Sequence, residues 1–166
     1  PALIYGAILG FVSVFISLVF YFIGMATESW TNWINMLVGL VLLVYLMLQY
    51  RKEYLGGYAS FGQIFLMVLV SAGIISVIIG SIYQYLLFTV IDPGLIEQVK
   101  IAAEEKIMSN SRIPESMLDD LLDKNEKRTT AVYLVKASLI AGPIINAILG
   151  LIIAAFIKKE EDVTPV

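Results

Sequence analysis

The chain has 166 residues, of which 59% are apolar and 15% are charged, and its formal net charge is -3. A soluble domain is about half apolar and about a quarter charged, so this composition, gathered in long apolar blocks, indicates a membrane protein. The small net charge gives no reason to expect a nucleic-acid partner. The sequence contains no Cys and no His, which excludes disulfides, thiolate chemistry and histidine acid–base catalysis.

Four apolar blocks predict four transmembrane helices. The first, residues 3–25, contains no charged residue and as a helix would extend roughly 35 Å, enough for a hydrocarbon core of about 30 Å. It is too long for the core of a signal peptide, so we expect it to be retained. The others cover residues 34–50, 61–91 and 131–157. Only a helix satisfies its own backbone hydrogen bonds in lipid, so the predicted fold is an all-α membrane protein with one domain, residues 1–166.

The segment 92–130 is the one long polar stretch, with nine acidic and six basic residues. Asp92 followed by Pro93 predicts the N-cap and first position of a helix. Apolar residues at helical spacing continue that helix to about Met108, and a second helix opens at Pro114 and Glu115. We expect the two to form a small helical cap between spans three and four, on the outer face of the bundle.

Four acidic residues of the second helix, Glu115, Asp119, Asp120 and Asp123, suggest either a solvated face or a site for a hard cation. They lack the spacing and the turn glycine of an EF-hand, so the solvated face is favoured. The chain has no nucleophile paired with a base. We therefore predict no catalytic residue, no cofactor and no metal site, and a protein that is not an enzyme.

The short loops predict the orientation in the membrane. Lys and Arg are enriched in cytoplasmic loops, and Arg51 with Lys52 and Lys158 with Lys159 follow the second and fourth spans. The turn after the first span has no basic residue, so both termini are expected in the cytoplasm. The six basic residues of segment 92–130 argue for the opposite orientation, although they are spread over about forty residues.

Lys136 and the pair Arg51-Lys52 each have two possible roles. Lys136 lies about one turn inside the fourth span, where its long side chain can reach the nearby interface. Its alternative role is contact with an ion or a lipid headgroup. For Arg51 and Lys52, the alternative to an orientation signal is a loop that docks a partner.

Small residues recur at helical spacing in three of the four spans. In lipid, close backbone approach through small residues helps to hold helices together. These candidates are Gly6, Gly10, Ser13 and Ser17 in the first span, Ala72, Ser76 and Gly80 in the third, and Ser138, Gly142, Asn146 and Gly150 in the fourth. They close the bundle on itself, or one group binds a partner subunit or a second copy. The second span has only Gly39, so we expect it to face lipid.

Polar and helix-breaking residues inside the spans are few. Gln84 and Asn146 are the deepest amides, expected to form interhelical hydrogen bonds and, alternatively, to line a path for a solute. The pair Gly142-Pro143 predicts a kink in the fourth helix. Broken helices also form binding sites in carriers.

Several local patterns occur together along nearly the whole chain. They are Tyr5-Gly6-x3-Gly10, Tyr50-Arg51-Lys52, Gly57 with Ser60-Phe61-Gly62, Ile91-Asp92-Pro93, and Gly150-Leu151-Ile152 leading to Lys158-Lys159. In this order and spacing, the chain resembles a bacterial family of small four-span inner-membrane proteins, common in Bacteroidota and known as a domain of unknown function. The resemblance implies the topology derived above and no reaction, substrate or catalytic residue.

The sequence offers no catalytic residues, but it has small-residue faces and a helical cap that could bind other proteins. We expect a non-enzymatic, multi-pass protein of the inner (cytoplasmic) membrane that binds another membrane protein or itself, as an accessory subunit of a larger complex. The alternative is an oligomeric or passive transporter or channel for a small solute or lipid.

Overall fold

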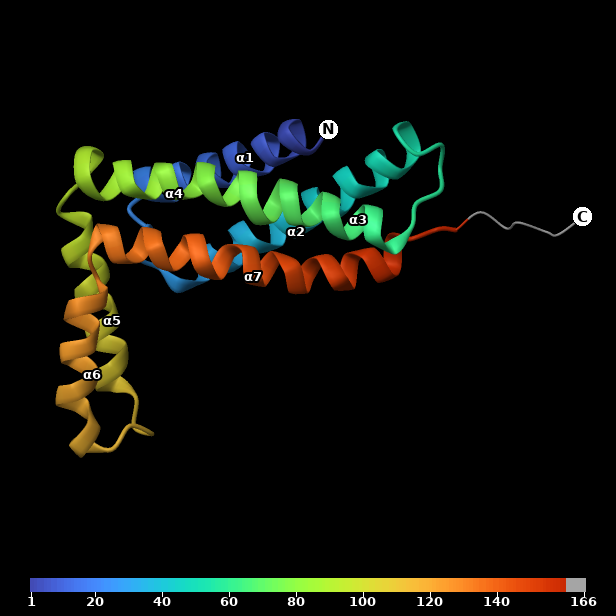
Figure 1. Ribbon diagram of the computed structural model, residues 1–166. Helices are drawn as coiled ribbons and strands as arrows, with labels where there is room; N and C mark the ends of the chain where they lie inside the picture. The colour runs from blue at the N-terminus through green and yellow to red at the C-terminus, as the bar shows by residue number, and fades with distance from the viewer. Residues whose placement is uncertain (161–166) are drawn as a thin grey trace, which may run out of the picture. The chain divides into compact units, whose positions relative to one another are not determined.

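The computed structural model describes residues 1–160, which form helices joined by short loops (Figure 1). In this part of the chain, four helical runs are long and apolar enough to cross a membrane: α1 (Ala2–Phe22), α2 (Ser29–Glu53), the run Phe61–Ile91, and α7 (Ala131–Ile157). The all-α fold with four candidate spans is confirmed. The first helix ends before the predicted residue 25, and Gly24, with φ of +75°, lies in the turn that follows. The second is longer than residues 34–50 at both ends.

The third span is a continuous run with two wide-turned segments. It consists of α3 (Phe61–Val68), the π-helix η1 (Leu69–Ser76), α4 (Val77–Leu86) and a second π-helix, η2 (Leu87–Ile91). A capping box starts it, because the Ser60 side chain accepts from the Gln63 N–H and the Gln63 side chain accepts from the Ser60 N–H. The predicted limits 61–91 agree with the structure, whereas the π-helical segments were not predicted.

Two further helices, α5 (Leu95–Ser109) and α6 (Glu115–Arg128), lie between spans three and four. Both agree with the predicted cap helices. The expected start of the first is wrong: Asp92 ends η2, its N–H donating to the Leu87 carbonyl, and the N-cap of α5 is Gly94. Asp92 therefore belongs to the end of one helix instead of the start of the next.

The chain divides into two compact units. The bundle unit contains Pro1–Gly80 and the chain from Leu139 onward, and the hairpin unit contains Ser81–Ser138. The first holds α1, α2, α3, η1 and most of α7. The second includes α5 and α6, which pack against each other. The single domain expected from sequence stays a prediction.

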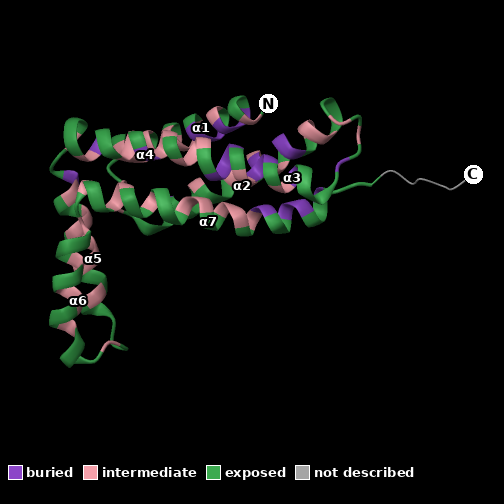
Figure 2. Ribbon diagram, in the orientation of Figure 1, coloured by how far each residue is buried: buried purple, intermediate pink, exposed green. Residues whose placement is uncertain are grey.

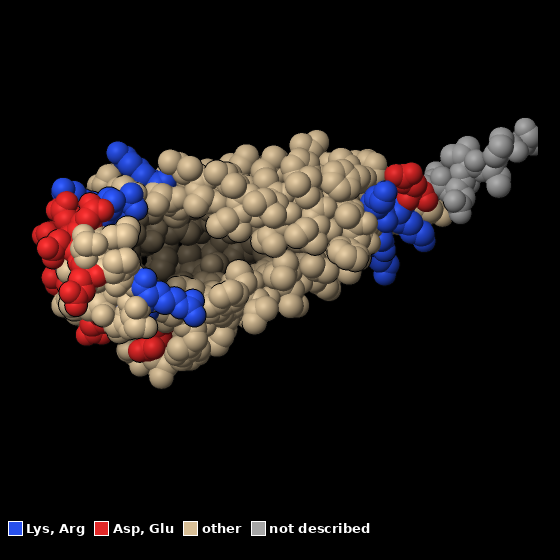
Figure 3. All heavy atoms as spheres, turned by 90° about the horizontal axis from the view of Figure 1, so that it is seen from below, with Lys and Arg blue, Asp and Glu red and all other residues tan. Residues whose placement is uncertain are grey.

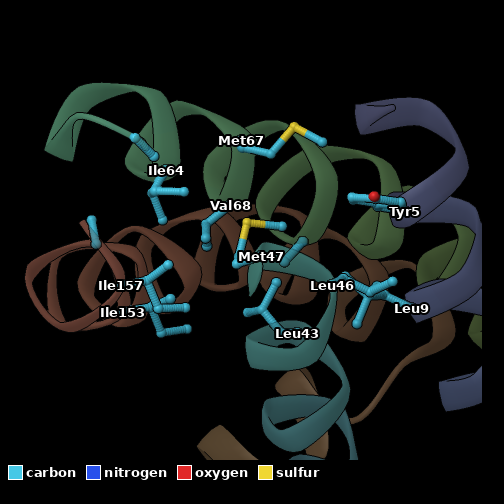
Figure 4. Packing of buried hydrophobic residues seen from close by; sticks show 13 residues of the cluster. Tyr5, Leu9, Leu43, Leu46, Met47, Ile64, Met67, Val68, Ile153 and Ile157 are labelled. Carbon is cyan, nitrogen blue, oxygen red and sulfur yellow. The ribbon is translucent and has the colours of Figure 1, made fainter. Parts of the chain in front are cut away.

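The core of the bundle unit joins residues from all of its helices. Met47 of α2, Ile64 and Val68 of α3, and Ala154 of α7 are fully buried. Figure 4 shows Met47 and Val68 side by side, with Ile64, Ile153 and Ile157 around them. In Figure 2 the buried stretches lie on α2, α3 and the last turns of α7.

The second span takes part in this core like the others. The buried share of its apolar window is 22%, the same as for α1 and α7. The expectation that it faces lipid more than the other spans is therefore wrong, since its burial equals that of α1 and α7. Its bulky side chains fill the core: Leu43, Leu46 and Met47 are buried, so a helix without small residues packs through large ones.

Candidate functional site

Two glycines of α1 lie directly against the third span. A Cβ added at Gly6 would lie 2.5 Å from the Ile75 Cβ and 2.7 Å from the Ser71 carbonyl oxygen, and one at Gly10 would lie 2.9 Å from the Ile79 Cβ. Real Cβ atoms do not approach so closely. The absence of side chains at these positions thus permits the contact between α1 and the third span.

Glycines of α7 contact the third span in the same way. A Cβ at Gly142 would lie 2.6 Å from the Val77 Cγ2, and one at Gly150 would lie 3.2 Å from the Val68 Cγ1. Gly80, by contrast, has no atom within 4 Å of its Cβ position. The small residues of α1 and α7 therefore both pack on the third span, whereas Gly80 lies open.

One amide joins α1 to α2. The Asn35 side chain donates to the Ser17 hydroxyl at 3.1 Å and to the Ser13 carbonyl at 3.3 Å, and it accepts from the Ser13 hydroxyl at 3.0 Å. The amide oxygen and both amide hydrogens of Asn35 thus have partners, which holds its orientation. Ser13 and Ser17 were predicted from sequence as small packing residues, and Asn35 was missed.

A cavity of about 290 Å³ lies inside the bundle unit. Its walls come from α1, α2, the third span and α7, and no charged residue lines it. Its polar lining residues are Ser13, Asn32, Asn35, Ser76 and Asn146.

The cavity brings together three predicted residues from three spans, Ser13, Ser76 and Asn146. The Asn146 amide donates to the Gly142 carbonyl at 2.9 Å, which leaves its carbonyl oxygen available. In the described part of the chain, the Ser76 hydroxyl and the Asn32 amide have no hydrogen-bond partner. The site therefore presents both donors and acceptors without any charge.

Most of the charged residues of the bundle unit lie at one end. Arg51 donates from Nη1 to the Ile157 carbonyl at 2.7 Å, which places a cation at the C-terminus of α7. Ala59 and Lys159 exchange two backbone hydrogen bonds of 2.8 and 2.9 Å, and the Lys159 ammonium lies 5.3 Å from the Tyr58 ring centroid. In Figure 3 blue and red charged atoms gather at one end of the bundle unit. Lys52 and Lys158 are exposed there.

Of the remaining predicted residues, Gln84, Lys136 and Ser138 belong to the hairpin unit. Ser138 lies 3.1 Å from the Ser81 hydroxyl and donates to the Gln84 side chain at 3.3 Å, so small polar residues join α4 to α7. Ala72, of the bundle unit, is buried in η1. Lys136 is exposed.

The α5–α6 hairpin is held by its own polar side chains. The Asn125 amide donates to the Lys100 carbonyl at 3.2 Å, and the Lys100 ammonium lies 3.8 Å from the Glu126 carboxylate. On α6, Lys127 donates to Asp123 at 2.6 Å. This hydrogen bond and the charge of the carboxylate raise the pKa of Lys127 above its ordinary value.

The acidic residues of α6 form no metal-binding group. Within residues 1–160, no three or more acidic side chains are grouped so that they could hold a metal ion. Asp120 pairs with Lys124 at 2.6 Å, one turn along the helix. The arrangement is that of a solvated helix face with local ion pairs.

Comparison with known proteins identifies the family. Residues 4–159 match the family described as "Protein of unknown function (DUF4199)", so the chain belongs to it. No curated protein and no solved structure matches. The chain is thus a member of a family of unknown function with four apolar helices.

Proposed function

We propose that the protein is a non-enzymatic, multi-pass protein of the bacterial inner membrane that acts as an interaction subunit of a larger membrane complex. The α5–α6 hairpin carries the proposal. It is long, polar and held by its own hydrogen bonds and ion pairs, yet Ile101, Met108 and Met117 remain exposed by 46%, 60% and 50%. Methionine adapts to irregular partner surfaces.

The small-residue faces of the bundle are not available to a partner, which supports the hairpin as the docking surface. Gly6, Gly10, Gly142 and Gly150 lie against the third span of the same chain, so they are not free to dock another helix. A partner protein would therefore contact the hairpin. We propose that this partner presents an apolar surface for the exposed methionines, with basic groups near the carboxylates of α6.

A site-specific crosslink in the native host tests the proposal. A photo-reactive amino acid in place of Met108 should give one crosslinked species of defined mass, and Ile101→Ser combined with Met117→Ser should reduce its yield severalfold. These substitutions are at exposed positions, where effects on stability are small. The matched control carries the same probe at Leu48, a 41% exposed residue of α2, and should not give this species. Equal crosslinking from Leu48 and Met108 would reject the hairpin as the docking surface.

We also propose that both termini lie in the cytoplasm. The support is the group of basic residues at one end of the bundle unit, since Lys and Arg favour the cytoplasmic side. Single cysteines at Ser29 and Ser111 should then react with a membrane-impermeant reagent from outside. Reaction only at Tyr58→Cys would reverse the orientation.

A second candidate, passive movement of a small solute or lipid, is favoured by the uncharged cavity. Reconstituted protein should then increase flux across liposomes, and Asn146→Asp should change it by placing a charge in the wall. Absence of flux with the unmodified protein would eliminate transport and leave the interaction proposal standing.

A further inference from the structure

We infer that the cavity of the bundle unit binds the uncharged, hydrogen-bonding head group of a single-chain amphiphile, of the monoacylglycerol type, while its chain lies against the apolar helices. This inference does not depend on the partner-binding role or on transport. It rests on the lining of the cavity, on its depth in the spans and on the polar groups left without partners.

The lining selects against charge. None of the residues around the cavity is ionisable, and a charged head group would lose its hydration without gaining a counter-ion. Arg51 and Lys52, the basic residues nearest along α2, lie in the last turn of that helix. An anionic lipid head would bind there instead. The head group in the cavity is therefore uncharged.

The depth of the cavity indicates how a ligand reaches it. Ser76 lies midway along the run Phe61–Ile91, and Asn35 lies about 9 Å along the helix axis from the first residue of α2. A molecule in the bilayer can reach this depth from the side, because α2 and α7 both line the cavity. The lining residues Met36 and Ile145 are exposed by 47% and 55%, so an acyl chain could lie against them.

The free polar groups match a diol. Ser76 and Asn32 can donate, and the side-chain oxygen of Asn146 can accept. Ser76 and Asn146 are part-buried, and in hydrocarbon such groups are costly to leave without partners. Asn32 is exposed near the start of α2 and can bond either to water or to a ligand. Hydroxyls of a ligand satisfy donors and acceptors alike. Asn35 is already satisfied by α1 and serves as a fixed part of the wall. A volume of about 290 Å³ is at the lower limit of ligand pockets, about 300–1,000 Å³, and suits a compact head group.

Native mass spectrometry of the full chain in detergent tests the inference with three probes. They are monooleoylglycerol, glycerol, and oleoyl-lysophosphatidylglycerol, which has a charged head. We expect one monooleoylglycerol to be retained per protein at concentrations where glycerol is not retained. The charged probe should bind at least about tenfold more weakly. A tenfold loss of affinity corresponds to about 1.4 kcal/mol, and burying a charge without a partner costs more than that.

Two glycines provide a matched pair of variants. Gly39 lines the cavity and Gly80 does not, and neither has an atom within 4 Å of its Cβ position. Gly39→Leu should fill the cavity and abolish retention, whereas Gly80→Leu should retain the probe like the unmodified protein. Helical circular dichroism and a single elution peak check folding. If Gly39→Leu does not fold, Ser76→Ala, with almost the same volume, should weaken retention about three- to tenfold.

Three results would overturn the inference. One is equal retention by Gly39→Leu and Gly80→Leu. Another is unchanged retention by Ser76→Ala. The third is a ladder of adducts with no defined stoichiometry, which would mean that the cavity holds water and that the probe binds only to the outer surface.

Discussion

The contact of α1 with the third span predicts a specific cost for adding one methyl group. In Gly6→Ala the new Cβ would lie 2.5 Å from the Ile75 Cβ and 2.7 Å from the Ser71 carbonyl oxygen. Neither atom can rotate away, because one is a backbone atom and the other is fixed to it. The helices must therefore move apart, and overpacking of this kind costs about 1–3 kcal/mol.

The same substitution at Gly80 separates this cost from the effect of helix propensity. Alanine is favoured over glycine inside a helix by about 1 kcal/mol, and Gly80 has open space around it. Gly80→Ala should therefore unfold at or above the temperature of the unmodified protein. Gly6→Ala should unfold at a lower temperature than the unmodified protein. In a chain of this size, each kcal/mol of lost stability lowers the unfolding temperature by about 2–4 °C.

Thermal unfolding in one detergent, followed by circular dichroism, makes the comparison. If Gly6→Ala is as stable as Gly80→Ala, the close approach of α1 to η1 is not present in the folded protein. The small residues of α1 would then not serve to pack the bundle. Unfolding should be compared at a single protein-to-detergent ratio.

Three other substitutions test the polar contacts. Asn35→Leu should lower the free energy of unfolding by about 1–2 kcal/mol, because hydrogen bonds between α1 and α2 are lost, and denaturant titration measures it. Arg51→Gln should destabilise the last turn of α7 by about 1 kcal/mol, seen as faster amide exchange there, whereas Lys52→Gln should leave exchange unchanged. In Asp123→Asn the pKa of Lys127 should fall toward its ordinary value. In the unmodified protein the ion pair stabilises the fold fully at pH values below the pKa of Lys127 in the unfolded chain, and this stabilisation is lost as pH rises through the higher pKa of the folded chain. An NMR titration of the Lys127 ammonium measures the fall in its pKa.

The hydropathy pattern was sufficient to predict the spans. Long apolar blocks can only be helices in lipid, and the predicted limits of the third and fourth spans, residues 61–91 and 131–157, agree with the structure. The existence of both hairpin helices was equally predictable from the apolar spacing, and Pro114 correctly marks the start of α6. Helix ends that depend on loop geometry were harder to predict. Asp92 has the residue type of an N-cap, yet its backbone completes the preceding helix.

The wall of the cavity could not be predicted, because it depends on tertiary contacts. Ser13 and Ser17 have the spacing of packing residues, but nothing in the sequence indicates that they form hydrogen bonds with Asn35 of another helix. The π-helix η1 is similar: its residues have no local signal that separates them from an α-helix. Gly80 follows Ser76 at the right spacing, and still nothing packs on it.

The distribution of glycine contacts accounts for the position of the cavity. Gly6 and Gly10 join α1 to the third span, and Gly142 and Gly150 join α7 to it, so the third span is the common neighbour. The second span contacts α1 and α3: Asn35 near its start bonds to α1, and large residues near its far end pack in the core, where Met47 is fully buried. No glycine brings α2 close to α7. Asn35 of α2 and Asn146 of α7 both line the cavity, whose wall is mostly apolar with a few uncharged polar side chains, so a molecule that fills it meets apolar surface and hydrogen-bonding groups together.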